Sequence, residues 1–168
     1  MNPPSSQARG APTVFIDADG CPVKDETYRV AQRLQLSVEV VCNRSLAVPS
    51  SARVRLVVVG HGSDEADKYI AAQVRPGDVV VTADMPLAAR VVDAGAHPIT
   101  PRGRVYDADS ISDALAARDL ATTLRSFTMD GAGGGGGPPT FGPKDRSQFL
   151  NQLDALLQRA LRSPPRSR

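Results

Sequence analysis

Residues 78–95, DVVVTADMPLAARVVDAG, contain one complete strand–turn–helix unit. The three valines after Asp78 predict a strand over 78–82 that is buried on both faces, because a strand with one wet face would alternate apolar and polar residues. The stretch 85–94 has helical periodicity, and Gly95 follows it as a helix stop. A strand that leads directly into a helix of this length is the unit from which parallel sheets are built.

The rest of the first two thirds of the chain repeats this unit. The further predicted strands are 13–17, 37–42, 55–60 and 96–100, and the further predicted helices are 22–34, 64–74 and 109–127. Strands that alternate with helices favour a parallel sheet covered on both faces. The sequence therefore predicts an α/β fold: a three-layer sandwich with a parallel sheet of about five strands, followed by C-terminal helices.

The C-terminal part has a different composition. The run GAGGGGGPP at 131–139 favours a flexible loop, and the stretch 147–161 predicts a last amphipathic helix. We expect that helix to pack on the sheet domain, the alternative being a tethered helix that binds a partner or a second copy. The predicted organisation lists as tail 1–12, α/β domain 13–128, Gly/Pro-rich loop 129–143, C-terminal helix 144–162 and tail 163–168.

Composition excludes several classes of protein. The chain has 20 basic and 18 acidic residues and a net charge of +2, which excludes a histone-like polycation. It has no run of 18 apolar residues, so no membrane span is predicted. Residues 1–12 lack an apolar signal core, and the two cysteines, Cys21 and Cys42, are too few for a zinc motif or a disulfide framework. We expect a cytoplasmic protein with reduced thiols and leave its oligomeric state open.

Aspartates gather where the predicted strands end. The chain has 15 Asp and only 3 Glu; Asp17 and Asp19 close the first strand, Asp64 and Asp67 open the helix after the third, and Asp84 follows the fourth. Ligands of open parallel sheets bind outside the carboxyl ends of the strands, where the strand order reverses. If the first and fourth strands are neighbours there, Asp17 and Asp84 face each other. The alternative for Asp64 and Asp84 is helix N-capping.

A cluster of carboxylates needs a cation to offset its repulsion. All-oxygen acidic clusters suit Mg²⁺ or Mn²⁺ rather than zinc. The chemistry they most often serve is metal-activated water attacking a phosphodiester. The acids therefore favour a divalent-metal-dependent nuclease or phosphodiesterase acting on RNA or DNA.

Four stretches carry a resemblance to a known family: IDADGCPVKDETYRVA (16–31), GSDEADKYIAAQVRPGDVVVTADMPLA (62–88), PRGRVYD (101–107) and GPKDRSQFLNQLDALL (142–157). They resemble the YaiI/YqxD family of uncharacterised bacterial proteins, which looks like a branch of the PIN-like nuclease superfamily. The resemblance covers about residues 13–160. It implies a parallel sheet of order 3-2-1-4-5 and an Asp cluster that binds Mg²⁺ or Mn²⁺.

Carried over by motif, that resemblance assigns catalysis and metal binding to Asp17, Asp67 and Asp84. Asp19 and Asp64 are additional candidate metal ligands. Many PIN-like nucleases have a further acid just past the position of Asp84, and Met85-Pro86-Leu87 supplies none here. A non-catalytic PIN-like module that binds RNA or protein is therefore the alternative.

A second enzymatic alternative is an aspartyl-phosphate phosphatase. The stretch Asp17-Ala18-Asp19-Gly20 resembles the Asp-x-Asp strand end of those enzymes, in which the first acid is a nucleophile. Cys21 stands where they have Thr or Val after that glycine. No convincing Lys precedes Asp84.

The remaining candidates are basic residues, histidines and a thiol. A basic rim for a phosphate backbone is predicted from Arg102, Arg104, Lys24, Arg44 and Arg146, the alternative being a solvated arginine surface. Cys21, before a predicted helix, could be a reactive thiol or an inert buried one. His61 could ligate a metal or make only local hydrogen bonds, and His97 is given no role.

Overall fold

The computed structural model describes residues 10–127 and 140–163. The predicted tails and the Gly/Pro-rich loop lie largely outside these residues. The strands are β1 (Val14–Asp17), β2 (Val38–Cys42), β3 (Val54–Val58), β4 (Val79–Val81) and β5 (His97–Ile99). The helices are α1 (Lys24–Arg33), α2 (Glu65–Gln73), α3 (Met85–Asp93), α4 (Ala108–Phe127) and α5 (Pro143–Arg162).

The five strands form one parallel sheet in the order β3-β2-β1-β4-β5, which confirms the predicted topology. The central strand, β1, pairs with β2 on one side and with β4 on the other, so that Val14 lies opposite both Val38 and Val79. The strand order reverses between β1 and β4. All five carboxyl ends lie at one edge of the sheet, and the two strands at the reversal both lead into aspartates.

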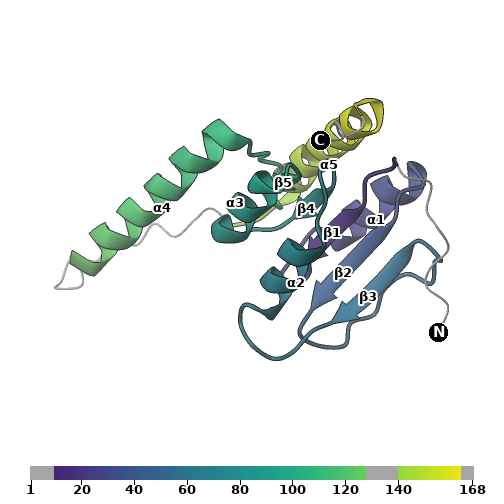
Figure 1. Ribbon diagram of the computed structural model, residues 1–168, viewed down its shortest axis with the longest axis horizontal. Helices are drawn as coiled ribbons and strands as arrows, with labels where there is room; N and C mark the ends of the chain where they lie inside the picture. Colours follow the sequence, from purple (N-terminus) through teal and green to yellow (C-terminus); the bar gives the residue numbers. More distant parts are fainter. Residues whose placement is uncertain (1–9, 128–139, 164–168) are drawn as a thin grey trace.

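Helices cover both faces of the sheet, as shown in Figure 1. Successive side chains of β1 point to opposite faces, because the side-chain period of a strand is two. Val14 and Ile16 join the core cluster that contains buried residues of α1 and α5, whereas Phe15 joins the cluster that contains those of α2 and α3. The three valines of β4 are fully buried, as the run of apolar residues predicts.

The last helix, α5, is part of the core. Phe149, Leu153 and Leu157 are fully buried in the cluster shared with α1. The helix begins at Pro143, four residues before the predicted start at 147. Proline suits a first helical turn, and the Asp145 carboxylate accepts a hydrogen bond from the Gly142 amide at 2.9 Å. Pro143 and the Asp145 contact therefore start the helix before its apolar periodicity begins.

The predicted helix at 109–127 is present as α4, but little of it is buried. Its first turns pack on α3, where Ile111 is buried beside Ala88 and Tyr106. Leu120 is 60% exposed and Phe127 is 79% exposed. Leu120 lies nine residues after Ile111, about two and a half turns, and so lies on the opposite side of the helix. The apolar residues of α4 therefore form two separate faces, and only the first face packs on the domain.

Candidate active site

Three aspartates lie at the carboxyl edge of the sheet, at the ends of different elements. Asp17 is the last residue of β1, Asp84 precedes the first residue of α3, and Asp67 lies in the first turn of α2. Because Ile16 pairs with Val81, the residues that follow these two lie next to each other where β1 and β4 end. The edge at which the strand order reverses is therefore acidic.

Thr82 connects two of these aspartates. Its hydroxyl donates to Asp17 Oδ2 at 2.9 Å and accepts from the Asp84 amide at 3.0 Å. The side chain is buried, so both hydrogen bonds lie away from bulk water. The sequence predicts Thr82 only as the last residue of a strand. Its sequence signal was a polar residue at the end of an apolar strand, two positions before an aspartate.

Asp84 also caps a helix. Its Oδ1 accepts from the Leu87 amide at 2.8 Å, and Pro86 occupies the first turn of α3. This is the N-cap role that was the alternative for Asp84. The cap fixes the direction of the carboxylate and uses one oxygen. The second oxygen, Oδ2, makes no hydrogen bond within the described residues.

The three carboxylates affect one another electrostatically. Burial raises the pKa of Asp17, and the charges of Asp84 and Asp19 raise it further, while the Thr82 hydrogen bond lowers it. Burial, followed by the charges of Asp84 and Asp17, raises the pKa of Asp67 to about 6. The positive charge of Arg90 opposes that shift. Asp17, Asp67 and Asp84 therefore share one electrostatic environment.

The two additional candidates have other partners. Asp19 is exposed, and its Oδ2 accepts from the Asn43 amide at 3.1 Å, which joins the loops that follow β1 and β2. Asp64 precedes α2 but makes no side-chain cap hydrogen bond. It pairs with Lys68 at 3.1 Å instead, and this lysine lowers the pKa of Asp64.

The carboxylates are suitable ligands for a hard cation, but they are not arranged around one ion position. Carboxylate oxygens are the ligands that Mg²⁺ and Mn²⁺ prefer. Within residues 10–127 and 140–163, however, no group of three or more His, Cys, Asp or Glu side chains is placed to hold a metal ion. The charge of Asp84 raises the pKa of both Asp17 and Asp67, so the three carboxylates are neighbours, but they are not arranged around a common point at which one ion could bind.

Two of the predicted phosphate-binding arginines make internal contacts. Arg102 pairs with Asp145 at 3.1 Å, and Arg146 pairs with Glu26 at 2.8 Å. Both guanidinium groups lie over the ring of Phe141, at 5.8 and 5.1 Å from its centroid. These contacts hold α5 against the domain.

The other basic residues are divided between internal contacts and solvent. Arg104 lies over the Tyr106 ring at 5.0 Å, and the Lys24 ammonium donates to the Cys21 carbonyl at 2.6 Å. Gly103, with φ +86, lies so close to α5 that an added Cβ would be 2.9 Å from the Gln148 carbonyl. Arg44 is exposed. A role for these five cations in nucleic-acid binding stays a prediction.

The thiols and histidines lie in ordinary environments. Burial raises the pKa of Cys21, which favours an inert thiol over a reactive one. The Cys42 thiol is buried and donates to the Arg44 carbonyl. His61 is exposed in the loop before α2, and His97 is half-buried at the start of β5.

The fold and this edge define an α/β protein with a parallel, doubly wound sheet and three aspartates where the strand order reverses. Comparison with known proteins then shows the family. The protein-family model described as "Uncharacterized BCR, YaiI/YqxD family" matches residues 15–159 of this chain. The chain belongs to this family.

Relatives in other bacteria match most of this chain. A UPF0178 protein of Rhodopseudomonas palustris (strain HaA2) is 47% identical over 156 residues, which cover 92% of this chain and 93% of the relative. One from Azorhizobium caulinodans is 49% identical over 151 residues, covering 90% and 92%. One from Brucella suis is 49% identical over 151 residues, covering 89% and 91%.

Neither a related solved structure nor a membrane-spanning helix was found, the latter among the described residues. No solved structure gives a significant match to this chain. In the part of the chain that the structure describes, no helix is both long and apolar enough to cross a membrane.

Proposed function

We propose that this protein is a divalent-metal-dependent nuclease or phosphodiesterase that acts on RNA or DNA. The observation that carries the proposal is the electrostatic coupling of Asp17, Asp67 and Asp84 at the carboxyl edge of the sheet. Carboxylates that are partly buried beside one another raise the energy of the charged state. A bound cation would remove that penalty.

Oxygens remain available for such a cation. The hydrogen bond from Thr82 uses only Oδ2 of Asp17, and the helix cap uses only Oδ1 of Asp84. Asp67 makes no side-chain hydrogen bond within the described residues. The proposal therefore requires that the Asp67 side chain turns toward Asp17 and Asp84 when a cation arrives.

Each residue has a separate part in this scheme. Asp17, Asp67 and Asp84 would hold Mg²⁺ or Mn²⁺, which supplies an activated water and stabilises the leaving oxygen. Thr82 orients Asp17 through the hydrogen bond to Oδ2, and the N-cap of α3 orients Asp84. Asp17 and Asp84 are thus fixed before binding, whereas Asp67 is free to adjust.

One observation favours a second candidate, a non-catalytic module that binds RNA or a protein. The acids do not form a ready metal site among the described residues. A family member that had lost metal binding would keep the sheet and its capped helices. It would still present its basic groups to a polyanion.

The two candidates are separated by measuring metal binding and cleavage on the same preparations. Mn²⁺ is titrated calorimetrically into wild type, Asp17→Asn and Asp93→Asn, and each protein is incubated with end-labelled RNA and single-stranded DNA. Asp93 is an exposed residue at the far end of α3, so its substitution is a matched control for the loss of one carboxylate.

The nuclease proposal expects wild type and Asp93→Asn to bind Mn²⁺ and to cleave, and Asp17→Asn to do neither. Because all three proteins are purified alike, cleavage by a contaminant would persist in Asp17→Asn. Nucleic-acid binding by wild type with EDTA present, without any cleavage when Mn²⁺ is supplied, would favour the binding module instead. A wild type that neither binds Mn²⁺ nor cleaves would overturn the nuclease.

A further inference from the structure

The path of α4 places part of it near the acidic edge. The chain enters α4 after Tyr106, whose amide donates to the Pro98 carbonyl, so the helix starts beside β5. It packs on α3 through Ile111, Ala114 and Leu115. Figure 1 shows that α4 then runs in the direction of the strands and continues past the edge of the sheet at which they end.

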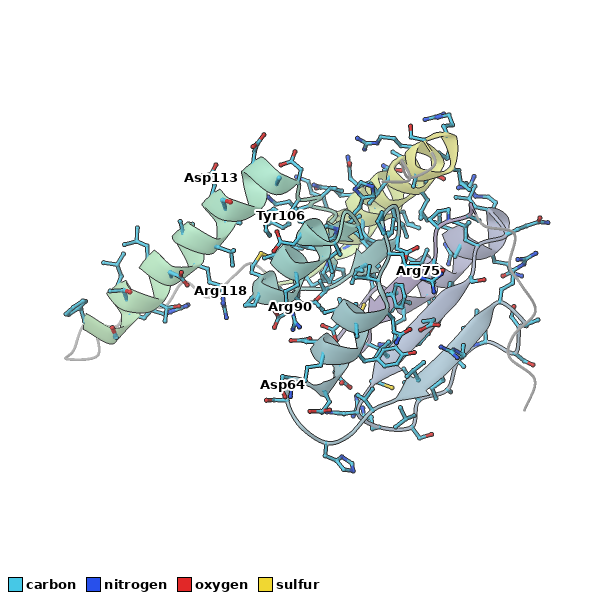
Figure 2. All side chains as sticks on the ribbon, viewed as in Figure 1. Asp64, Arg75, Arg90, Tyr106, Asp113 and Arg118 are labelled. Carbon is cyan, nitrogen blue, oxygen red and sulfur yellow. The ribbon has the colours of Figure 1, made fainter. Side chains whose placement is uncertain are left out.

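Arg118 follows the packed face of α4. It lies seven residues after Ile111 and three after Leu115, so all three share one side of the helix. Since α4 packs along α3 and runs in the opposite direction, the residue one turn past Leu115 lies toward the start of α3, the end that Asp84 caps. In Figure 2 the labelled Arg118 side chain extends from α4 on the side where Arg90 of α3 lies.

Arg90, in the last turn of α3, lies near one of these acids, Asp67. Its charge lowers the pKa of Asp67, which shows that it lies within electrostatic reach of that carboxylate. It is exposed, as Arg118 is. Neither guanidinium group makes a hydrogen bond or an ion pair with any of the residues in 10–127 and 140–163. In this they differ from Arg102 and Arg146, which hold α5 in place.

We propose that Arg90 and Arg118 form a cationic rim that binds the phosphates on either side of the phosphodiester presented to Asp17, Asp67 and Asp84. This inference rests on the proposed function, because it names the part of that site that would hold the nucleic-acid backbone.

The chemistry of the edge calls for such a rim. A nucleic acid that approaches three carboxylates is repelled, and the metal offsets only the charge at the bond to be cleaved. Flanking phosphates need cations of their own. A guanidinium group binds phosphate through two parallel hydrogen bonds, and an exposed one loses no internal partner when it does so.

The test measures binding without turnover. We measure binding by fluorescence anisotropy with labelled 12-nucleotide single strands of RNA and DNA. The buffer contains EDTA, and the salt concentration is varied. The proteins compared are wild type, Arg90→Gln, Arg118→Gln and the double variant. Arg29→Gln is the matched control, since Arg29 is an exposed arginine of α1, on the other face of the sheet. Melting midpoints confirm that all variants fold.

We expect the double variant to bind about tenfold more weakly than wild type, and each single variant to lose part of that affinity. The slope of log K against log salt should fall by about 1.4 for two lost phosphate contacts on a single strand. Arg29→Gln should bind as wild type does. An equal loss in Arg29→Gln would mean that overall charge matters and would overturn the rim.

Failure of the rim is distinguishable from failure of the proposed function. If wild type cleaves with Mn²⁺ while the double variant binds and cleaves as well as wild type, the rim is wrong and the nuclease stands. If wild type neither binds nor cleaves either strand, the nuclease is wrong and the rim falls with it.

Discussion

The two edges of the sheet use buried carboxylates in opposite ways. At the amino edge, Asp78 accepts from the Thr13 amide and from the Arg75 amide, both at 2.8 Å, and so ties the start of β1 to the start of β4. At the carboxyl edge, Asp17 accepts one hydrogen bond and lies beside two further carboxylates. Burial raises the pKa of both acids.

The difference shows that burial alone does not identify a functional acid. At Asp78 both oxygens are occupied by backbone amides, which compensate for the lost hydration. At Asp17 one oxygen is left over, and the neighbours are negative rather than amide donors. A buried acid with unused oxygens and like-charged neighbours is poorly stabilised by the protein itself. Ligand binding can supply what is missing.

The largest expected effect separates the two edges by activity. If the proposed function holds, Asp17→Asn lowers the rate of Mn²⁺-dependent cleavage about 100-fold or more, because one charged ligand is lost. Asp78→Asn should cleave at the wild-type rate at a temperature where it is folded. Single-turnover cleavage of labelled RNA measures both. Equal losses in the two variants would remove the distinction between the edges.

The next effect is on the free energy of unfolding, and here the larger loss is expected at Asp78 and the smaller at Asp17. Asp78→Ala leaves the Thr13 and Arg75 amides without their acceptor, which should lower the free energy of unfolding by about 2–3 kcal/mol. Urea unfolding followed by circular dichroism measures the change. Asp17→Asn serves as the comparison and should lose much less, since it removes a charge that its neighbours repel. A loss at Asp78 no larger than that at Asp17 would contradict the structural role.

A smaller loss is expected at the residue that orients Asp17. Thr82→Val removes a buried hydroxyl with two hydrogen bonds and should cost about 1–2 kcal/mol in urea unfolding. It should also raise the pKa of Asp17 further, because the hydrogen bond from Thr82 lowers it. Any Mn²⁺-induced stabilisation would then begin at a higher pH than in wild type. Thr82→Ser keeps the hydroxyl and should restore the wild-type onset.

The smallest effect is a gain in stability that depends on pH. Asp67 has a pKa of about 6 in the folded protein and an ordinary value of 3.8, so the folded state binds this proton more tightly. Stability from that proton is present below about pH 4 and is lost as the pH rises through about 6. Asp67→Asn should therefore be more stable than wild type at pH 7–8 and no more stable near pH 4.

After allowance for the partial exposure of Asp67, we expect a gain of about 1 kcal/mol, or about 2–4 °C in the melting midpoint. Thermal melts at pH 4, 6 and 8 measure it. Asp93→Asn is the control, since Asp93 is an exposed carboxylate at the far end of α3, and its melting midpoint should follow wild type at every pH. If the gain in melting midpoint of Asp67→Asn is the same at all three pH values, the charge of Asp67 does not destabilise the folded protein.

Much of the fold could be predicted because its signals are local. The apolar run of β4 predicted a doubly buried strand, and the strand is fully buried. The positions of Asp17 and Asp84 after their strands followed from the same pattern. The start of α5 was placed too late because it depends on Pro143 and Asp145, which carry no apolar signal.

Local signals could not predict which charged residues pair with each other inside the protein and which lie at the acidic edge. Arg146 was expected at a phosphate rim, but its partner Glu26 lies 120 residues away in the chain. Thr82 was missed because its partner Asp17 lies 65 residues away. Nothing in the sequence pointed to Arg118, because its proposed place beside the acidic edge depends on how α4 packs along α3.

By itself, the sequence determined the order and approximate position of the strands and helices and that acids follow the strands, because hydrophobic periodicity and chain direction act over a few residues. The tertiary structure decided which acids meet, which oxygens are already used, and which arginines hold the domain together. Hydrogen bonds and charge interactions depend on distance in space. Only the packing of β1 against β4 and of α5 against α1 brings those partners within reach.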